Sequence, residues 1–381
     1  MRSLKIASVW GIPIKLHVSL LVVLPIFAWL LGSGQQIELY AGLIEGLTGA
    51  PLDLDALTDG STSWVIGTAA AVGLFVSVAL HELGHAWAAM RYDLEVESIT
   101  LWILGGLANL GSIPREWNKE FWIAVAGPAT SVLVGAACYG ALTVIPASRP
   151  VVVFVAGWLA VTNVVLAVFN MIPAFPMDGG RVLRALLARN RPYATATRLA
   201  AGVGKTFAIL FGVFGLLGAG GINPMMILLA LFIYGAASGE SRTVVLADLL
   251  EGLTVDDLVT DGVATIAADA TISEFVTRMF AERRTQFAVV DDGDVVGIIT
   301  SDDFRAVPPE DRDTTTVAEL MASDLLTLAG STPAFDALVE LDQSRSTEAF
   351  VATPEGTRVV SRADFASAME MRKMLGTGDP F

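Results

Sequence analysis

The sequence has few cysteines, histidines and charged residues. Its single cysteine, Cys138, excludes a disulfide within the chain. Only 17% of the 381 residues are charged, against about 25% in a soluble domain. In contrast, 54% of the residues are hydrophobic and the mean hydropathy is +0.61. A core of ordinary size cannot enclose this excess of apolar side chains, so the chain belongs in a membrane.

Basic residues are scarce after residue 250. Residues 1–250 hold 14 acidic and 14 basic residues, whereas residues 251–381 hold 25 acidic and 10 basic residues, which account for the whole net charge of −15. The chain therefore combines a neutral apolar part with an acidic polar part. This acidity argues against nucleic acid as a partner, because phosphates would be repelled. The chain has five lysines and nineteen arginines. This ratio and the acidic tail are equally consistent with a protein from a high-salt cytoplasm and with an ordinary acidic domain.

Six apolar runs are long enough to cross a bilayer, which requires about 20 residues. They lie at 16–33, 63–90, 121–146, 151–176, 206–220 and 224–240. No small-residue cleavage site follows the first run, so a cleaved signal peptide is not expected. If both termini are cytoplasmic, 13 of the 14 basic residues before 250 lie inside, and only Arg149 lies outside. We predict a multi-pass protein of the cell membrane with both termini in the cytoplasm and an acidic outer loop over 34–62.

Two further regions have a recognisable organisation. Residues 94–103 alternate between polar and apolar at first, which predicts a strand or hairpin at the membrane surface. In the tail, TVDDLV at 254 and TVAELM at 316 lie 62 residues apart, and each is followed by a predicted helix, strand, turn, second strand and Asp-Phe pair. The predicted fold is an α-helical polytopic membrane protein with six transmembrane helices and a short membrane-associated β element, plus a cytoplasmic α/β tandem pair. The predicted domain bounds are 1–245, 250–308 and 312–372.

The second apolar run ends in HELGH, residues 81–85. His81 and His85 lie four residues apart, so both imidazoles face the same side of a helix and can bind one zinc ion. Glu82 can reach the water of such a site as a general base. Two packing histidines and a buried glutamate are a poor alternative, because ionisable groups inside a membrane span are costly and rarely idle.

A catalytic zinc needs a third protein ligand. The remaining histidine, His17, lies at the mouth of the first run and fits a structural hydrogen-bonding role at a helix end better than a ligand role. Pro173 and Pro176 preclude a regular helix at the end of the fourth run, whose only acidic residue is Asp178. In the predicted topology, Asp178 and HELGH both lie toward the cytoplasmic ends of their helices and can therefore meet.

These motifs resemble the site-2 protease family of intramembrane zinc metalloproteases, in the branch with two C-terminal CBS units. The resemblance rests on HELGH, on GPATS at 127 and on NVVLAVFNMIPAFPMDGGR from 163 to 181. It implies that His81, His85 and Asp178 ligate zinc and that Glu82 is the catalytic acid/base. It also implies that Asn170 lines the site, where it would hold the substrate strand or the oxyanion.

Two segments near these motifs add to the comparison. Ser131 departs from the family pattern, because many members carry Asn after the Gly-Pro pair. The GGLA segment at 105 resembles a family element that abuts the active site, and an extended edge there can pair with an unwound substrate by strand addition.

CBS units bind nucleotides in other proteins through a Thr or Ser followed three residues later by Asp. The matching residues are Thr300 and Asp303 in the first unit, and Ser361 and Asp364 in the second. The resemblance thus implies ATP, ADP or AMP as a ligand. The alternative is a module that only forms a homodimer or docks. We favour nucleotide binding because the motif residues are present in both units.

Two functions fit the sequence. The first is a zinc endopeptidase that cleaves transmembrane segments of membrane-protein substrates near the cytoplasmic side and is modulated by nucleotide. The second is a CBS-gated metal or anion transporter without peptidase activity. Glu82 favours the protease, because a transport site does not need a carboxylate that is not a ligand beside the first histidine.

The run GVGKT at 202 looks like a phosphate-binding loop. It does not match that motif, because Leu199 occupies the position of the first glycine and no strand precedes it. We interpret this run as a basic loop that enters the fifth span.

Overall fold

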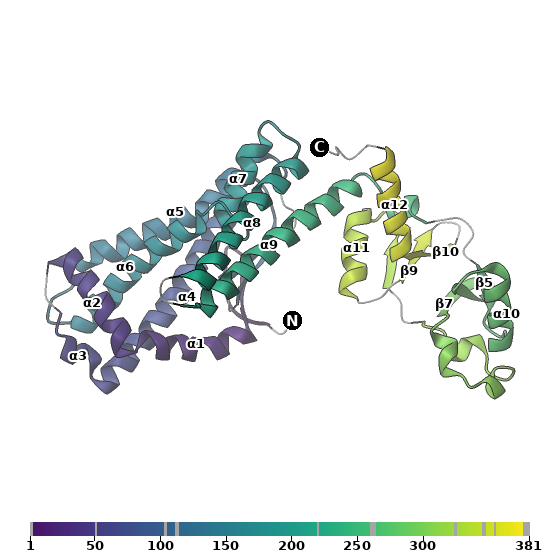
Figure 1. Cartoon of the computed structure of the whole chain (residues 1–381), viewed down its shortest axis with the longest axis horizontal. Coiled ribbons are helices and arrows are strands. Elements are labelled where there is room, and N and C mark those ends of the chain that lie inside the picture. Colours follow the sequence, from purple (N-terminus) through teal and green to yellow (C-terminus); the bar gives the residue numbers. More distant parts are fainter. Residues whose placement is uncertain are drawn as a thin grey trace. The chain divides into compact units, whose positions relative to one another are not determined.

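The computed structural model describes residues 3–49, 52–102, 105–110, 114–218, 221–259, 264–323, 326–344, 348–353 and 356–375. The chain divides into two compact units, Met1–Ser241 and Arg242–Phe381 (Figure 1).

The first unit is built from long apolar helices. Five of these helices can cross a membrane by length and hydropathy: α4 (Gly60–Met90), α5 (Trp117–Leu142), α6 (Pro150–Asn170), α8 (Tyr193–Leu217) and α9 (Pro224–Leu249). A sixth span is formed if α1 (Val18–Leu31) and the following α2 (Gly34–Thr48), which are bent by 67°, count as one. The predicted multi-pass helical fold is confirmed.

The spans differ from the prediction in two places. The predicted outer loop over 34–62 contains α2 and the short α3 (Leu54–Thr58). The fifth span begins at Tyr193 rather than at 206, so GVGKT lies inside α8 and the predicted basic loop is wrong. Hydropathy missed this first part of α8 because its buried face consists of alanine, threonine and glycine, and because Arg198 and Lys205 interrupt the apolar side chains of the other face.

Small residues bring α4 and α5 close together at the level of HELGH. A Cβ atom on Gly84 would overlap Thr130 Oγ1 and lie 2.8 Å from the Ala126 carbonyl oxygen, both on α5. Thr130 in turn donates a hydrogen bond to that carbonyl at 2.8 Å, so its side chain is fixed in place. The glycine of HELGH therefore sets the distance between the helix that carries the histidines and α5.

A four-stranded sheet packs against α4. Its strand order is β1 (Ser3–Val9), β2 (Ile12–His17), β3 (Val96–Trp102) and β4 (Gly105–Leu110). The β3–β4 pair confirms the predicted hairpin, whereas β1 and β2 were not predicted. Strand β2 pairs with β3 in parallel, and Ile14 and Ile99 pack in one core with Val78 and Ala86 of α4. Strand β4 is the terminal strand of this sheet.

The second unit contains two repeats of the same topology, as the internal sequence repeat predicts. The first repeat consists of β5 (Thr265–Ala267), α10 (Ile272–Glu282), β6 (Gln286–Asp291) and β7 (Asp294–Thr300). The second consists of β8 (Leu326–Ala329), α11 (Ala334–Gln343), β9 (Glu348–Thr353), β10 (Gly356–Ser361) and α12 (Arg362–Leu375). In each sheet the middle strand is parallel to the first strand and antiparallel to the last.

The segments that precede the two repeats are exchanged between them. Val255 and Leu258 are buried in the core of the second repeat, whereas Val317 is buried in the core of the first. Backbone bridges link Thr254 to Pro333 and Thr271 to Thr316 in the same crossed manner. Each repeat is therefore completed by the segment that leads into the other one, and the two repeats form a single folded module.

Candidate metal centre

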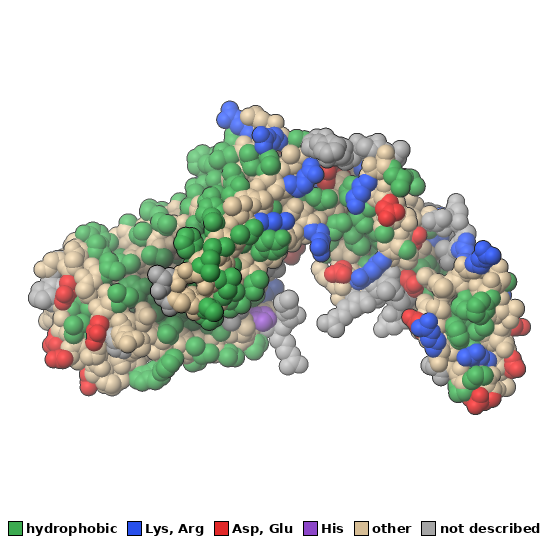
Figure 2. Space-filling model, viewed as in Figure 1, with side chains coloured by type: hydrophobic (Ala, Val, Ile, Leu, Met, Phe, Trp, Pro, Cys, Tyr) green, Lys and Arg blue, Asp and Glu red, His purple; other side chains and the backbone are tan. Residues whose placement is uncertain are grey.

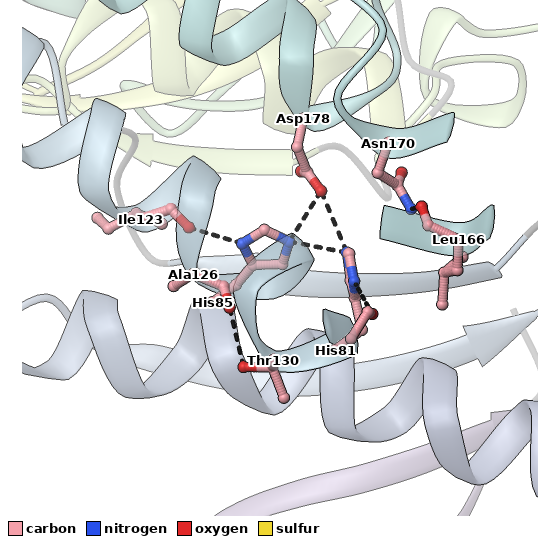
Figure 3. Close-up of polar contacts among 9 residues, drawn as sticks. His81, His85, Ile123, Ala126, Thr130, Leu166, Asn170 and Asp178 are labelled. Atoms are coloured by element: carbon pink, nitrogen blue, oxygen red, sulfur yellow. Dashed lines mark hydrogen bonds and ion pairs between the residues drawn. The ribbon is translucent and has the colours of Figure 1, made fainter. Parts of the chain in front are cut away.

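Three predicted ligands meet between α4 and the short helix α7 (Asp178–Ala188). Asp178 Oδ2 lies 3.1 Å from His81 Nε2 and 3.2 Å from His85 Nε2, and the two Nε2 atoms are 3.2 Å apart. Figure 3 shows the carboxylate of Asp178 facing both imidazole rings. All three side chains are buried, with exposed fractions of 4% to 7%. Three ligand atoms from two distant segments therefore surround one point.

These separations suit zinc. Tetrahedral zinc with bonds of about 2.0–2.1 Å holds its ligand atoms about 3.3 Å apart, close to the observed 3.1–3.2 Å. Two imidazole nitrogens and one carboxylate oxygen form a donor set typical of catalytic zinc, which takes three protein ligands and leaves a fourth position open. A metal ion also compensates the cost of burying three ionisable groups inside an apolar bundle.

A break between α6 and α7 positions Asp178. Helix α6 ends at Asn170, and residues 171–177, which contain Pro173 and Pro176, form turns. Helix α7 then begins at Asp178, so the predicted interruption is confirmed, although Asp178 itself is helical. Gly179 is required here because a Cβ atom would overlap the carbonyl oxygens of Met171 and Ile172. The first turn of α7 can therefore lie directly on the preceding turn.

Hydrogen bonds to the other ring nitrogens orient both histidines. His85 Nδ1 donates to the Ile123 carbonyl oxygen at 2.7 Å, so its Nε2 lone pair points toward Asp178. His81 Nδ1 lies 2.9 Å from Ser131 Oγ, and Ser131 is completely buried. Such contacts fix the tautomer and the orientation of ligating imidazoles. In the sequence, Ser131 stands out only as a departure from the family pattern, because its contact with His81 depends on the packing of α5 against α4.

Gly127 leaves space beside the two imidazoles. A Cβ atom at this position would overlap His85 Nε2 and would lie 2.8 Å from His81 Nε2. The glycine of GPATS thus clears the side of the site that faces α5. From the sequence alone, GPATS is only a family marker, because the motif does not reveal that α5 packs on α4.

Glu82 lies against the edge strand β4. A Cβ atom on Gly106 would overlap the side chain of Glu82 and lie 2.7 Å from its Oε1. The GGLA segment therefore abuts Glu82, in agreement with the family resemblance. Glu82 therefore lies against the face of β4, which is the terminal strand of its sheet.

Two other candidate residues have structural contacts. Asn170, at the end of α6, donates from Nδ2 to the Leu166 carbonyl oxygen at 3.0 Å, and its predicted role at the site stays a prediction (Figure 3). His17 is the N-cap of α1 and accepts a hydrogen bond from the backbone N–H of Ser19 at 3.2 Å. The expected structural role of His17 is confirmed.

In the second unit, the candidate nucleotide residues form the same constellation in both repeats. Thr300 donates to Asp303 Oδ2 from its N–H and its hydroxyl, at 2.7 and 2.8 Å. Ser361 donates to Asp364 Oδ2 in the same way, at 2.8 and 2.7 Å. In both cases these bonds leave Oδ1 for other partners. Burial, together with the charges of Asp303 and Asp364, raises the pKa of Glu348 to about 7.

Taken together, the apolar helices and the buried His-His-Asp set define a multi-pass membrane protein with a candidate zinc centre. The sequence model of Peptidase family M50 matches residues 69–151 and 142–211, and that of the CBS domain matches residues 255–310. Zinc metalloprotease MJ0392 of Methanocaldococcus jannaschii is 32% identical over 302 residues, which are 78% of each chain.

Two solved structures are also similar to parts of the chain. The site-2 protease from Methanocaldococcus jannaschii is 34% identical, with 63% of this chain and 96% of that chain covered and a TM-score of 0.42. The CBS domain of a bacterial CNNM/CorC family Mg²⁺ transporter in complex with ATP is 20% identical, with 35% and 97% covered and a TM-score of 0.31. On the strength of the identity to MJ0392, the chain belongs to Peptidase family M50 and is a zinc metalloprotease of the site-2 type with a CBS domain.

Proposed function

We propose that His81, His85 and Asp178 hold the zinc ion and that Glu82 is the catalytic acid/base. The observation that carries this assignment is the convergence of the three ligand atoms at 3.1–3.2 Å, with Glu82 one residue beyond His81 on α4. Zinc bound there would lower the pKa of a water molecule toward neutrality and polarise the peptide carbonyl. Glu82 takes a proton from the attacking water and delivers it to the leaving nitrogen.

We propose that the substrates are transmembrane segments of membrane proteins, cleaved near the cytoplasmic side. A helical segment protects its peptide bonds, so the substrate has to unwind before it reaches Glu82. The outer edge of β4 offers backbone groups for an extended chain, and Glu82 lies against the same strand at Gly106. Strand addition at β4 would therefore present a peptide bond to the catalytic carboxylate. Asn170 would hold the substrate or the oxyanion on the other side.

We propose a location in the cell membrane with both termini cytoplasmic. In Figure 2, acidic side chains gather at the end of the first unit that contains α2 and α3. Basic side chains gather around α7 and the start of α8, where Arg189 and Arg191 connect the two helices. This asymmetry supports the positive-inside orientation. In this orientation the metal centre would lie toward the cytoplasmic side, because Asp178 begins α7.

We propose that the second unit is a CBS pair that binds ATP, ADP or AMP and modulates cleavage. The proposed bounds are 1–245 for the protease domain and 250–308 and 312–372 for the CBS units, which would also mediate a homodimer. Support for the nucleotide comes from the matching Thr300–Asp303 and Ser361–Asp364 constellations. Among the residues that the structure describes, only Oδ2 of each carboxylate accepts these bonds, so Oδ1 can meet ribose hydroxyls. Calorimetry of the full chain with each nucleotide tests this step, with Asp303→Asn as the variant that should lose binding.

The transporter alternative has no comparable support. Membership of the M50 family makes the chain a metalloprotease, and Glu82 has no role in a transport site.

Replacing Glu82 by Gln tests the proposed mechanism. The amide is nearly isosteric but cannot accept a proton, so we expect the zinc content to stay and cleavage of a transmembrane peptide to fall by several orders of magnitude. Glu95→Gln, which alters an exposed carboxylate just before β3, is the matched control and should leave cleavage unchanged. Cleavage by the purified Glu82 variant at the wild-type rate would refute the mechanism.

A further inference from the structure

A buried arginine lies at the centre of a polar cluster that the catalytic mechanism does not use. Arg184, on α7, is only 1% exposed. Its Nε donates to Glu120 Oε1 at 2.7 Å, and its Nη1 donates to Glu240 Oε1 at 2.5 Å. The guanidinium also lies over the rings of Phe175 and Tyr193, at 4.9 and 5.0 Å from their centroids.

The contact between Arg184 and Phe175 joins the segments that precede and follow Asp178 in the sequence. Phe175 belongs to the turn that leads into Asp178, and Arg184 lies six residues after Asp178, about 9 Å further along α7. Arg184 thus binds the segments before and after the metal ligand to each other. Its two carboxylate partners belong to α5 and α9, so the same side chain attaches α7 to two membrane-spanning helices.

The ion pairs of Arg184 with Glu120 and Glu240 are expected to contribute little to the stability of the fold. A buried ion pair contributes little to stability, because the cost of desolvating both charges offsets their attraction. Within the part of the chain that the structure describes, Glu120 Oε2 is buried without a hydrogen-bond partner. Such an arrangement specifies one geometry at the expense of stability, and the geometry it specifies here is that of α7.

We propose that Arg184 is a positioning residue of the metal centre, which holds Asp178 against His81 and His85 by clamping α7 onto α5 and α9. This inference rests on the proposed role of Asp178 as a zinc ligand. Glu240 lies one residue before the boundary at Ser241, and α9 continues without a break to Leu249. The position of Asp178 therefore depends on the helix that leads into the second unit.

The experiment compares Glu240→Ala with Glu240→Gln in the full-length protein. The alanine removes the acceptor of Arg184 Nη1, whereas the glutamine keeps an oxygen in that place. We expect zinc affinity, measured in detergent by competition with a chelator, to fall about tenfold in the Ala variant and to be restored in the Gln variant. We also expect kcat to fall in the Ala variant with little change in KM, because the substrate edge at β4 is not altered.

Glu116→Ala is the matched control. It removes an ion pair at 2.7 Å between Glu116, the N-cap residue of α5, and Lys119 in the first turn of that helix, and should leave zinc affinity unchanged. The double variant Glu120→Leu/Arg184→Met removes the two deeply buried charges together. The remaining partner, Glu240, has a side chain that is 30% exposed and can be hydrated, so the fold is expected to be retained. Its zinc affinity should fall by at least as much as in Glu240→Ala.

Wild-type zinc affinity in both Glu240→Ala and the double variant would overturn the positioning role. A loss of affinity in Glu116→Ala equal to that in Glu240→Ala would also overturn it, because the effect would then follow from any ion pair on these helices. Failure of the proposed zinc site is recognised separately. In that case a His81→Ala/His85→Ala variant would keep its zinc.

Discussion

Gly127→Ala is predicted to remove zinc without disturbing the helix bundle. The added Cβ would overlap His85 Nε2 and lie 2.8 Å from His81 Nε2, so both nitrogens have to leave the position from which they face Asp178. A retreat of α5 from α4 would not restore the site, because it would break the contacts of Ser131 Oγ with His81 Nδ1 and of the Ile123 carbonyl with His85 Nδ1. Disturbing a group that only orients a ligand costs about 10–100-fold in metal affinity. Displacing two ligands should therefore cost at least 100-fold, or about 2.7 kcal/mol.

Gly140→Ala is the control for this prediction. Gly140 lies on the same helix, and a Cβ atom there meets nothing within 4 Å. Alanine is favoured over glycine in a helix by up to about 1 kcal/mol, so neither substitution should melt α5. Zinc affinity is measured by chelator competition in detergent, and helix content by circular dichroism. If Gly127→Ala binds zinc as tightly as the wild type, the placement of the two imidazoles against α5 is wrong.

Two further predictions concern a histidine contact and the second unit. Ser131→Ala removes the partner of His81 Nδ1 and should weaken zinc binding about tenfold with little effect on KM; wild-type affinity would show that Ser131 does not orient the ring. Because the pKa of Glu348 is about 7 in the folded protein, against an ordinary value of 4.5, the folded state keeps a proton that the unfolded chain loses. The contribution of this group to the free energy of unfolding of the second unit should therefore be highest below pH 4.5. It should decrease by at most about 3 kcal/mol as the pH rises from 4.5 through 7. Pulse proteolysis of the full chain in urea at several pH values measures this slope, which Glu348→Gln should remove; an unchanged slope in that variant would refute the assignment to Glu348.

The metal ligands were accessible from the sequence because their signals are local. HELGH places two imidazoles on one helical face whatever the tertiary structure, and Pro173 and Pro176 interrupt a helix by covalent geometry alone. The repeat in the tail was equally visible, since each copy preserves its own order of strand, helix and turn. These features required no knowledge of which helices pack together.

The residues that support the metal ligands could not be predicted from the sequence, because their contacts depend on the tertiary structure. Gly127 and Ser131 act only because α5 packs on α4, and Arg184 meets partners 64 and 56 residues away in the sequence. Likewise, the exchange of Val255 and Val317 between the repeats is a tertiary arrangement that the repeat itself does not specify. Hydropathy located the apolar runs but not the helix ends, which explains the early start of α8.

The central claim is that His81, His85 and Asp178 hold one zinc ion that serves Glu82. Zinc K-edge X-ray absorption of purified Glu82→Gln protein, combined with metal analysis, tests it most directly. We predict about one zinc per chain, bound by nitrogen and oxygen at about 2.0–2.1 Å with two imidazoles and no sulfur, and lost from His81→Ala/His85→Ala. Zinc retained at full occupancy in that double variant, or a spectrum with sulfur ligands, would contradict the account.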